Sequence, residues 1–535
     1  MWLQTYDPVG SSLGWSAAVA ALPLLVLVYL LGFRRRPAWR AAISALVAAW
    51  LLAVLVYRMP WSTALSAAAY GAAFGLFPIT WIVFSAILLY QLTVRCGRFE
   101  ELRAGLGRLT ADRALQALLI AFAFGAFLEG AAGFGTPVAV AAGMLAGLGF
   151  DPFFAAAVCL LANTAPVAFG SIGIPVVTLA GVTGLDELEL SAAVGKICAP
   201  VSLIIPGYLV WVMGGLSLLR TVLPAALACG LAFATAQFLV SNFIGPQLTD
   251  IVSSLSAIGT LIFVIRFSPG RSLRAEDSGS WTPARGTDFL APWAPYLFLV
   301  ALVLLWGVGP VREVLSRVTI TFPWPGLDGA VGRVPPVVSE VEVYPAVFRF
   351  DWLAAAGTAC FLASVASLAL PGVAWRHFRE AFVITGRQMA LPTLTIACVL
   401  GLAFLMNYSG AAATLGLALT STGPLFPFFS PILGWLGVFL TGSDTAANAL
   451  FGNLQVVTAQ HLALPPNLTA AANSAGGVLG KMISLQSIAV AVAATGLPRS
   501  DESRLFRFTL RHSIFLAGAM GLLVTVYAYL APDWF

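Results

Sequence analysis

The sequence predicts an all-α polytopic membrane protein with about 12 spans and two re-entrant hairpins. Of its 535 residues, 59% are hydrophobic and only 10% are charged, whereas soluble domains contain about 25% charged residues. Many apolar runs approach the roughly 20 residues that an α-helix needs to cross a bilayer. These runs lack the period-two alternation of transmembrane β-strands, so they favour helical spans.

Charge and cysteine usage exclude several kinds of site. The net charge of +5 does not require a nucleic-acid partner, because the arginines lie mostly in short loops, as the positive-inside bias predicts. The six cysteines lie in or beside apolar runs, without the spacing of a disulfide or metal site. The three histidines are scattered. We therefore expect the lipid bilayer as a partner, and no metal, cofactor or nucleic acid.

The arginine-rich loops set the predicted direction of each crossing. A span at about 15–33 delivers Arg34, Arg35 and Arg36 to the cytoplasm and places the N-terminus outside. A signal peptide is not expected, because its basic residues would precede the apolar run. The polar stretch 95–113 is predicted to lie on the inner surface. The other predicted spans cover about 41–57, 72–94, 196–216, 222–241, 248–266, 289–308, 352–371, 381–406 and 511–530. The last span places the C-terminus outside.

Two further pairs of apolar stretches are interrupted by small and polar residues. Residues 115–150 are predicted to form a hairpin that dips into the membrane, and residues 153–185 a broken crossing. Residues 424–461 and 467–496 are predicted to do the same from the other side. Irregular backbone at membrane depth requires cover by protein or a watery cavity, so these breaks are expected to face the interior.

The two arrangements also echo each other in sequence. Phe127-Leu128-Glu129-Gly130 aligns with Phe439-Leu440-Thr441-Gly442, and Asn163-Thr164-Ala165 with Asn473-Ser474-Ala475, at nearly the same offset. A shared bias toward glycine and alanine is the alternative explanation. The basic loops give the two stretches opposite orientations in the membrane. Together with the internal sequence similarity, this predicts one transmembrane domain built from inverted repeats, a pattern typical of secondary transporters. The predicted repeats cover 72–185 and 381–496, with a cytoplasmic loop at 266–288 and an external loop at 309–350.

Several strings of residues resemble the bacterial L-lactate permease family. They are residues 127–137 (FLEGAAGFGTP), 163–170 (NTAPVAFG), 333–340 (RVPPVVSE), 434–445 (GWLGVFLTGSDT) and 480–484 (GKMIS). The resemblance extends over nearly the whole chain, with small departures at Thr136 and Leu485. It implies a symporter in the bacterial cytoplasmic (inner) membrane that imports L-lactate, and also D-lactate or glycolate, with a proton. Composition and spacing alone indicate only a secondary transporter.

Two acids in apolar surroundings are the candidates for proton coupling. A charged side chain costs roughly 2.5–3.5 kcal/mol at the bilayer centre, so each of these acids needs a partner, a cavity or a function. Asp444, at the turn of the second hairpin, is the first choice, and Glu129, before the first turn, is the second. The structural alternatives are a helix cap at Asp444 and a hydrogen bond that closes the first hairpin at Glu129.

A substrate carboxylate needs a cation or a group of N–H donors. Lys481 lies on the second broken helix, where it can bind a carboxylate or pair with Asp444. The only other lysine, Lys196, is expected to extend to the outer interface. Half-helix N-termini at the breaks favour anions, and amide and hydroxyl side chains suit the hydroxyl group of a 2-hydroxy acid. Further candidates, whose alternative role is to satisfy freed backbone groups, are Asn163, Thr164, Ser443, Thr445, Asn473, Ser474 and Gln486.

Glycines at the breaks are predicted to form the hairpin turns and to permit close helix approach. The glycines assigned to the turns are Gly130, Gly133, Gly135, Gly442 and Gly477. Arg333 and Glu340, in the external loop, are expected at the surface or at a gate rather than as ligands.

The competing functions differ in the residues that they require. A transporter of the same fold that uses sodium or carries a dicarboxylate is the main alternative, although two carboxylates would favour more cations than Lys481. A membrane enzyme needs a nucleophile with a base, a metal cluster or a cofactor motif, and the sequence shows none of these. A passive channel does not require intramembrane acids and paired hairpins. The sequence also lacks a P-loop for ATP drive.

Overall fold

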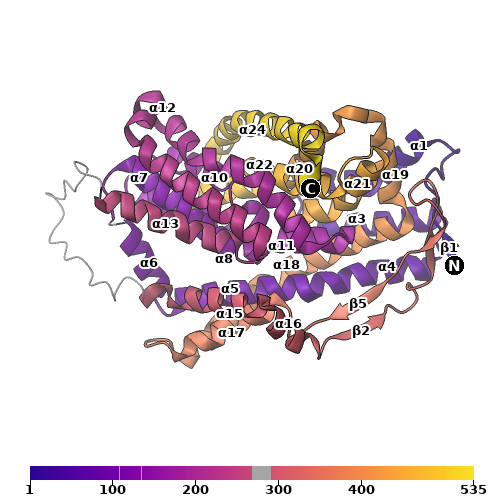
Figure 1. The fold of residues 1–535 in the computed structure, drawn as a ribbon, viewed down its shortest axis with the longest axis horizontal. Coiled ribbons are helices and arrows are strands. Elements are labelled where there is room, and N and C mark those ends of the chain that lie inside the picture. The colour runs from indigo at the N-terminus through magenta and orange to yellow at the C-terminus, as the bar shows by residue number, and fades with distance from the viewer. Residues whose placement is uncertain (108, 134, 268–290) are drawn as a thin grey trace.

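The computed structural model describes residues 1–107, 109–133, 135–267 and 291–535 (Figure 1). Within these residues, ten helices are long and apolar enough to cross a membrane, or up to twelve if each of two bent helix pairs counts as one span. The predicted all-α polytopic fold is therefore confirmed. The predicted cytoplasmic loop 266–288 lies outside the described residues from position 268 onward.

One group of helices packs around the long helix α18, which contacts α3, α4 and α5. Glycine permits this close packing, because a Cβ at Gly71 of α4 would lie 2.3 Å from the carbonyl oxygen of Leu400. A π-helical segment, Gly75–Thr80, joins α4 to α5, so the span predicted at 72–94 belongs to a longer apolar stretch, Trp61–Arg95. The group comprises α2 (Leu22–Val28), α3 (Ala38–Leu55), α4 (Trp61–Phe74), α5 (Trp81–Arg95), α15 (Ala294–Gly307), α17 (Ala356–Ala366) and α18 (Trp375–Ser409).

A second group of helices, residues 113–183, is the first of two similar units, and it begins with the first predicted hairpin. Asp112 caps α7, because its Oδ1 accepts hydrogen bonds from the backbone N–H groups of Ala114 and Leu115. The chain turns after α8, and α9 packs back against α8 and the preceding π-helical segment. Helices α10 and α11 then form a pair bent by 63°. The elements are α7 (Arg113–Ala117), the π-helix Leu118–Phe124, α8 (Gly125–Ala131), α9 (Thr136–Gly147), α10 (Pro152–Ala162) and α11 (Gly170–Thr183).

The second unit, residues 426–495, has the same order of elements as the first unit. A helix, a glycine-containing turn and a second helix are followed by a helix that breaks and resumes. Helix α22 packs closely against α20, because a Cβ at Gly476 would lie only 1.8 Å from the carbonyl oxygen of Pro431. The elements are α20 (Phe426–Thr441), α21 (Asp444–His461), α22 (Pro466–Lys481) and α23 (Leu485–Thr495).

The two units pack against each other, and each places its last helix against the hairpin of the other. Helix α11 of the first unit packs against α21 of the second, and α23 of the second packs against α9 of the first. The side-chain amide of Asn448 on α21 donates to the carbonyl oxygen of Pro175 on α11, at 3.1 Å. Both breaks are therefore covered by the other unit, as backbone groups freed at membrane depth require.

Three further long helices pack beside these units. The backbone of α12 (Glu187–Phe243) departs from helical geometry at Gly214 and Gly215, so α12 contains both spans predicted at 196–216 and 222–241. Helix α13 (Thr249–Phe267) packs against α12 and α8, and α24 (Glu502–Leu530) packs against α20 and α22.

The predicted external loop is more regular than the sequence indicates. It contains the short helix α16 (Gly309–Ser316), and β3 pairs in parallel with the N-terminal strand β1. Strands of two to four residues give too little periodicity to be predicted, and the partner strand is remote in sequence. Helix α19 (Ala411–Leu419) also follows α18 where no element was predicted. The strands are β1 (Trp2–Leu3), β2 (Ile320–Pro323), β3 (Val331–Arg333), β4 (Glu342–Val343) and β5 (Val347–Phe350), in sheets ordered β1-β3-β4 and β2-β5.

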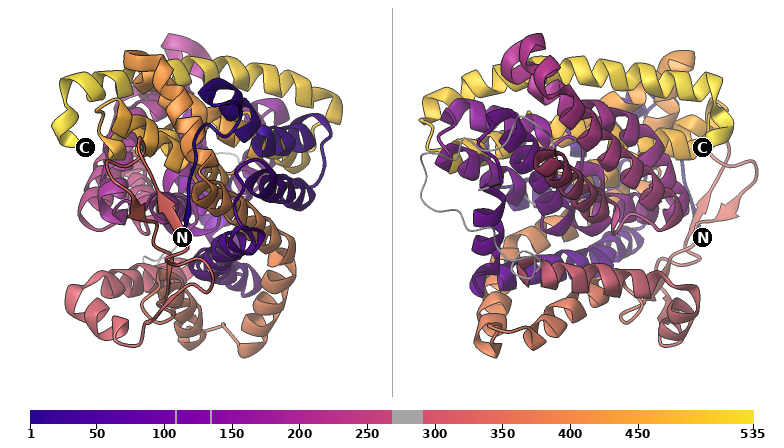
Figure 2. Two further views of the ribbon diagram at one scale, coloured as in Figure 1. Left: turned by 90° about the vertical axis from the view of Figure 1, so that its right-hand side faces the viewer. Right: turned by 60° about the vertical axis from the view of Figure 1, so that its left-hand side comes forward.

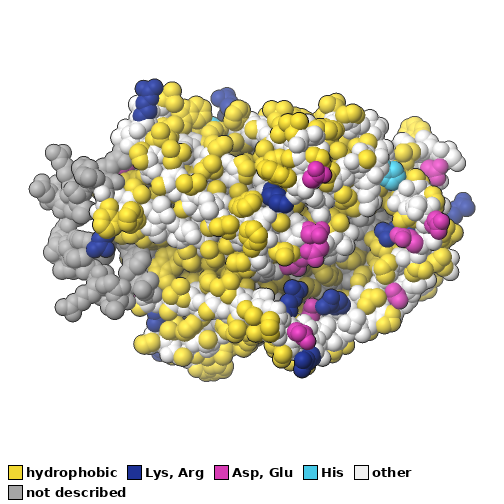
Figure 3. All heavy atoms as spheres, in the orientation of Figure 1, with side chains coloured by type: hydrophobic (Ala, Val, Ile, Leu, Met, Phe, Trp, Pro, Cys, Tyr) yellow, Lys and Arg dark blue, Asp and Glu magenta, His cyan; other side chains and the backbone are white. Residues whose placement is uncertain are grey.

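The strands and the N-terminus lie at the opposite end of the long axis from α6 (Arg98–Gly107) and α7 (Figure 1). The C-terminus lies near the middle of the long axis in Figure 1. The left-hand view of Figure 2 looks onto the end with the N-terminus and the strands. Hydrophobic side chains cover much of the face in Figure 3, and charged side chains are few there. The long helices run between the two ends, with an apolar surface suited to contact with lipid.

Candidate functional site

The turn of the second hairpin is built by Thr441, Gly442 and Ser443. Gly442 adopts a φ of +72°, which disfavours any residue with a Cβ. The Thr441 hydroxyl accepts a hydrogen bond from the backbone N–H of Ser443 at 3.2 Å. The Ser443 hydroxyl in turn caps α21 by accepting from the N–H of Ala446 at 3.2 Å. This local chemistry ends α20, starts α21 and places Asp444 in the first turn of α21.

Asp444 is buried between α21 and α22, with 3% of its surface exposed. Its Oδ2 accepts hydrogen bonds from the Ser474 hydroxyl at 2.6 Å and from the Asn448 amide at 3.5 Å. Among the described residues, its Oδ1 has no hydrogen-bond partner. A Cβ at Gly477 would lie 2.1 Å from this Oδ1, so the carboxylate fits only because residue 477 is glycine.

Lys481, the last residue of α22, binds the turn of the second hairpin. It is 8% exposed, and its ammonium donates to the carbonyl oxygen of Gly442 at 2.6 Å. In the part of the chain that the structure describes, it forms no ion pair with Asp444, so the predicted pairing is not seen. Its charge nevertheless acts on both Asp444 and Glu129.

Glu129 lies near the end of α8, with 4% of its surface exposed. Its Oε1 is so close to the break before α11 that a Cβ at Gly170 would lie 2.8 Å from it. Its Oε2 has no hydrogen-bond partner among the described residues. The first hairpin and the first break meet beside it, where the Ser171 hydroxyl donates to the carbonyl oxygen of Ala132 at 3.3 Å.

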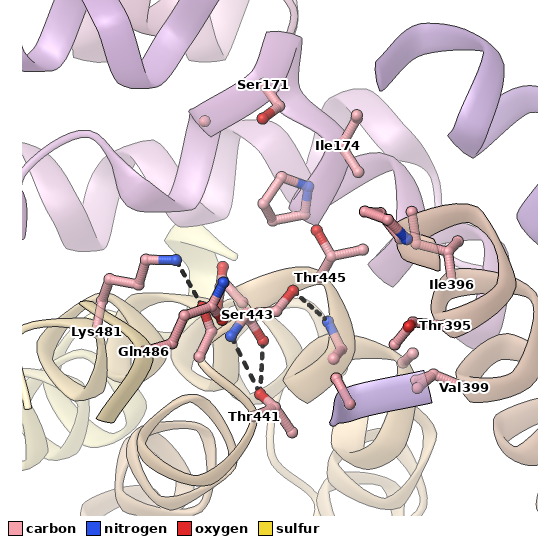
Figure 4. Close-up of a pocket in the computed structure, with 18 of the residues that line it drawn as sticks. Ser171, Ile174, Thr395, Ile396, Val399, Thr441, Ser443, Thr445, Lys481 and Gln486 are labelled. Carbon is pink, nitrogen blue, oxygen red and sulfur yellow. Dashed lines mark hydrogen bonds between the residues drawn. The ribbon is translucent and has the colours of Figure 1, made fainter. Parts of the chain in front are cut away.

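A cavity of about 300 Å³ lies between the two units and the α18 group. Small-molecule sites typically have volumes of about 300–1,000 Å³. One side is polar and comes from the second hairpin turn, Lys481 and Gln486, with Glu129 and Ser171 contributed by the first unit. The opposite side is mainly apolar. Figure 4 shows Thr395, Ile396 and Val399 of α18 across the cavity from Ser443, Lys481 and Gln486.

The cavity includes six of the predicted site residues and leaves out four. Asp444, Glu129, Lys481, Ser443, Thr445 and Gln486 line it. Asn163, Thr164, Asn473 and Ser474 do not line it, so the structure does not place these four where they would touch a substrate.

Three of the four excluded residues form hydrogen bonds with other protein groups. The Asn473 amide group donates to Asn448 Oδ1 at 2.9 Å and accepts from Gln455 at 3.2 Å. The Thr164 hydroxyl donates to the carbonyl oxygen of Leu161 at 2.6 Å. Ser474 binds Asp444. These side chains therefore stabilise the hairpins and breaks, which is the alternative role considered from sequence.

Asn163 differs from its repeat counterpart, Asn473. It is 4% exposed, and neither its Oδ1 nor its Nδ2 forms a hydrogen bond of normal geometry within the described ranges, although its side chain interacts with the carboxylate of Glu129. The sequence match between the two asparagines therefore does not extend to equal surroundings.

Several lining residues were not predicted. Thr441 and Ser171 lie beside glycines at the two breaks, so the criterion that selected Ser443 could have found them. The apolar wall, including Leu391, Pro392 and Val399, carries no sequence signal that separates it from other parts of a span.

The glycines divide into turn and helix positions. Gly133, Gly135 and Gly442 have positive φ angles of 58°, 82° and 72° at the turns. Gly130 and Gly477 lie inside α8 and α22 instead, so their assignment to the turns does not match the structure. At these two positions the missing side chain makes room for Asp250 and Asp444, respectively.

No group of three or more His, Cys, Asp or Glu side chains that could hold a metal ion occurs among the described residues. What the cavity offers is one ammonium, two acids, several hydroxyls and an apolar wall. These groups can bind a small anion and exchange a proton.

Comparison with known proteins identifies the family. The family model described as L-lactate permease matches residues 16–531. The chain belongs to the L-lactate permease family. It is 44% identical to the L-lactate permease of Bacillus subtilis, over 96% of each chain. It is 44% identical to that of Escherichia coli K12 and 43% identical to the glycolate permease GlcA of the same strain, with each alignment covering 99% of this chain and 98% of the relative.

Membership of the L-lactate permease family confirms the resemblance found in the sequence strings. The protein is a multi-pass membrane transporter and not an enzyme, as predicted. Because the alignments run nearly end to end, both hairpins and the cavity lie within the matched region.

Proposed function

We propose that the protein is a proton-coupled symporter that imports L-lactate and related 2-hydroxy monocarboxylates, D-lactate and glycolate, across the cytoplasmic membrane. The observation that carries this proposal is the position of Lys481. Among the described residues that line the cavity, Lys481 is the only cation, and it lies beside two buried acids. One cation suits one substrate carboxylate. The names of the relatives, which include lactate and glycolate permeases, support the same substrate class.

The substrate carboxylate is proposed to bind between Lys481 and the first turn of α21. The first N–H groups of a helix lack intrahelical partners and attract anions. The hydroxyls of Ser443 and Thr445 line the same side and suit the 2-hydroxyl group. The short alkyl part of the substrate then faces the apolar wall of α18, including Val399.

Proton coupling follows from the charge of the substrate. Lactic acid is almost wholly ionised at neutral pH, and a negative interior opposes anion entry by about 2.3 kcal/mol per charge per 100 mV. Co-transport of one proton removes that net charge. Sequence reasoning places Asp444 before Glu129 as the proton carrier. The hydrogen bonds favour Glu129, because donors stabilise an ionised carboxylate, and Asp444 Oδ2 accepts from Ser474 and Asn448.

Alternating access is proposed to come from inverted repeats at 72–185 and 381–496. The shared element order and the reciprocal packing of α11 on α21 and α23 on α9 support a two-fold relation. Glu340 and the C-terminal Asp533 are then external, and Arg504 is cytoplasmic. Single cysteines at these positions, labelled by an impermeant reagent from each side, test the orientation. A cytoplasmic Glu340 would contradict it.

The proposed function is tested by uptake of radiolabelled L-lactate into proteoliposomes. An imposed pH gradient, acidic outside, should drive accumulation, and an imposed sodium gradient should not. Accumulation driven by sodium alone would show that sodium, the alternative coupling ion, and not the proton drives transport. Competition by a dicarboxylate but not by glycolate or D-lactate would overturn the substrate assignment.

A further inference from the structure

A third buried acid, Asp250, lies behind the site. It is the second residue of α13 and is 1% exposed. A carboxylate at the start of a helix can accept hydrogen bonds from the free backbone N–H groups of the first turn. Asp250 does not, because neither Oδ1 nor Oδ2 has a hydrogen-bond partner within residues 1–107, 109–133, 135–267 and 291–535. Capping therefore does not explain a carboxyl group in an apolar interior.

The neighbour of Asp250 is the first hairpin, next to Glu129. A Cβ at Gly130 would lie 2.7 Å from the Cβ of Asp250 and 3.2 Å from the backbone nitrogen of Ile251. Helices α8 and α13 therefore approach as closely as a glycine permits. Glu129 precedes Gly130, and its charge acts on Asp250. Glu129 lines the cavity, whereas Asp250 does not.

Apart from the partial positive charge at the N-terminus of its own helix, the described surroundings provide no cationic side chain paired with Asp250. Helix α13 packs against α8, α11, α12 and the π-helical segment Leu118–Phe124. From these elements, Glu129 and the buried thiol of Cys198 interact electrostatically with Asp250. No lysine, arginine or histidine in the described part of the chain forms an ion pair with it. Lys481 acts on Glu129 and Asp444 instead.

Two neighbouring buried carboxylates cannot both stay ionised at low cost when Asp250 has no hydrogen-bond donor and Glu129 has one oxygen without a partner among the described residues. Burial penalises each charge, and the like charge of the neighbour penalises it again. Such a pair titrates as a unit, and its protons belong to the pair rather than to one residue. A sodium ion would need several converging oxygen ligands, whereas no hydroxyl or amide forms a hydrogen bond with the Asp250 carboxyl group among the described residues.

We propose that Asp250 and Glu129 form a carboxyl pair that holds the transported proton, with Asp250 as the member remote from the substrate. This proposal rests on the proposed proton-coupled function. The pair alternates between two bound protons, with no net charge, and one bound proton, with a single negative charge. Release breaks one O–H bond at Glu129, and that proton leaves through the cavity that Glu129 lines. Asp250 retains or passes on the other proton and so keeps the pair from carrying two charges.

The test uses Asp250→Asn, which keeps the size of the side chain and removes the titrating group. Electroneutral symport with one proton accumulates lactate about tenfold for a pH gradient of about one unit. We expect the wild type to approach that ratio and Asp250→Asn to equilibrate lactate without accumulation, while lactate counterflow stays within about twofold of wild type. Ser253→Ala is the matched control, since Ser253 is buried one turn along α13 and its hydroxyl bonds only the backbone of its own helix. Ser253→Ala should accumulate lactate like the wild type.

The possible outcomes separate this inference from the function on which it rests. Wild-type accumulation by Asp250→Asn overturns the carboxyl pair and leaves proton symport intact. A wild type that accumulates lactate only with sodium overturns both. If Asp250→Asn does not fold, infrared spectra of the wild type decide the question. A protonated-carboxyl C=O band that is altered in Glu129→Gln supports the pair, and the absence of that band at every pH at which transport occurs contradicts it.

Discussion

The two hairpins have the same architecture but treat their acids differently. In the second hairpin, the acid follows the turn, and Asp444 accepts hydrogen bonds from Ser474 and Asn448. In the first hairpin, the acid precedes the turn, and Glu129 Oε2 has no partner in the described chain. Each acid has one oxygen without a partner among the described residues, Asp444 Oδ1 and Glu129 Oε2. The acid with more hydrogen-bond donors is better suited to remain ionised, and the acid with fewer donors is better suited to accept a proton. This difference supports our proposal that the second hairpin binds and orients the substrate and the first hairpin carries the proton.

The two asparagines at the breaks show the same asymmetry. Asn473 is held by Asn448 and Gln455, whereas Asn163 interacts with Glu129 but forms no hydrogen bond of normal geometry among the described residues. The second unit is therefore the more completely hydrogen-bonded of the two. A site that must change protonation is expected in the less satisfied unit, since unmade hydrogen bonds there can be made in another state.

The largest expected effect concerns the cation on the second unit. Lys481→Ala should weaken lactate binding at least about tenfold, or ~1.4 kcal/mol, because the substrate carboxylate loses its ammonium. Binding is measured by lactate protection against thermal unfolding in detergent or by the half-saturation of counterflow. Lys196→Ala is the control, because Lys196 bonds the C-terminal Trp534 backbone and lies outside the cavity. Wild-type affinity in a folded Lys481→Ala variant would remove Lys481 from the site.

A smaller effect is expected from closing the space beside Asp444. Gly477→Ala would place a Cβ 2.1 Å from Asp444 Oδ1, and overpacking of this kind costs about 1–3 kcal/mol. We expect a lower melting temperature together with loss of transport. Gly259→Ala is the matched control, because it lies in α13 with no atom within 4 Å of the added Cβ. Equal melting temperatures for Gly477→Ala and the wild type would show that the carboxylate lies elsewhere.

The asparagines give the smallest predicted difference. Asn473→Ala should reduce stability by about 1–3 kcal/mol, because it leaves buried partners unsatisfied. Asn163→Ala should reduce stability less, since the Asn163 side chain forms no hydrogen bond of normal geometry that would be lost. Thermal unfolding of the two variants measures the difference directly. An Asn163→Ala variant less stable than Asn473→Ala would reverse the comparison between the units.

Much of this architecture could be predicted from sequence, because breaks in apolar runs are local signals. Gly442-Ser443 marked the second turn, and the lone Lys481 and Asp444 marked the polar wall of the cavity. What lines the other wall could not be predicted, because Val399 lies in an apolar run like many others. Repeat symmetry misled the assignment of Asn473, since equal residues at equal positions do not specify equal hydrogen-bond partners.

Asp250 was missed although its signal was present. It is a lone acid at the start of an apolar run, which is the criterion that singled out Glu129. Its position near a predicted span end made it resemble an ordinary helix-end residue. Only the packing of α13 on Gly130 places it in the interior beside the first hairpin.

The central claim is that the first hairpin carries the proton and the second the substrate. It is tested most directly by measuring lactate-driven proton movement into proteoliposomes for Glu129→Gln and Asp444→Asn side by side, with counterflow as the measure of intact substrate binding. The account predicts that Glu129→Gln exchanges lactate without moving protons, whereas Asp444→Asn still moves a proton with each lactate that it transports. Proton movement that persists in Glu129→Gln and is lost in Asp444→Asn would contradict it.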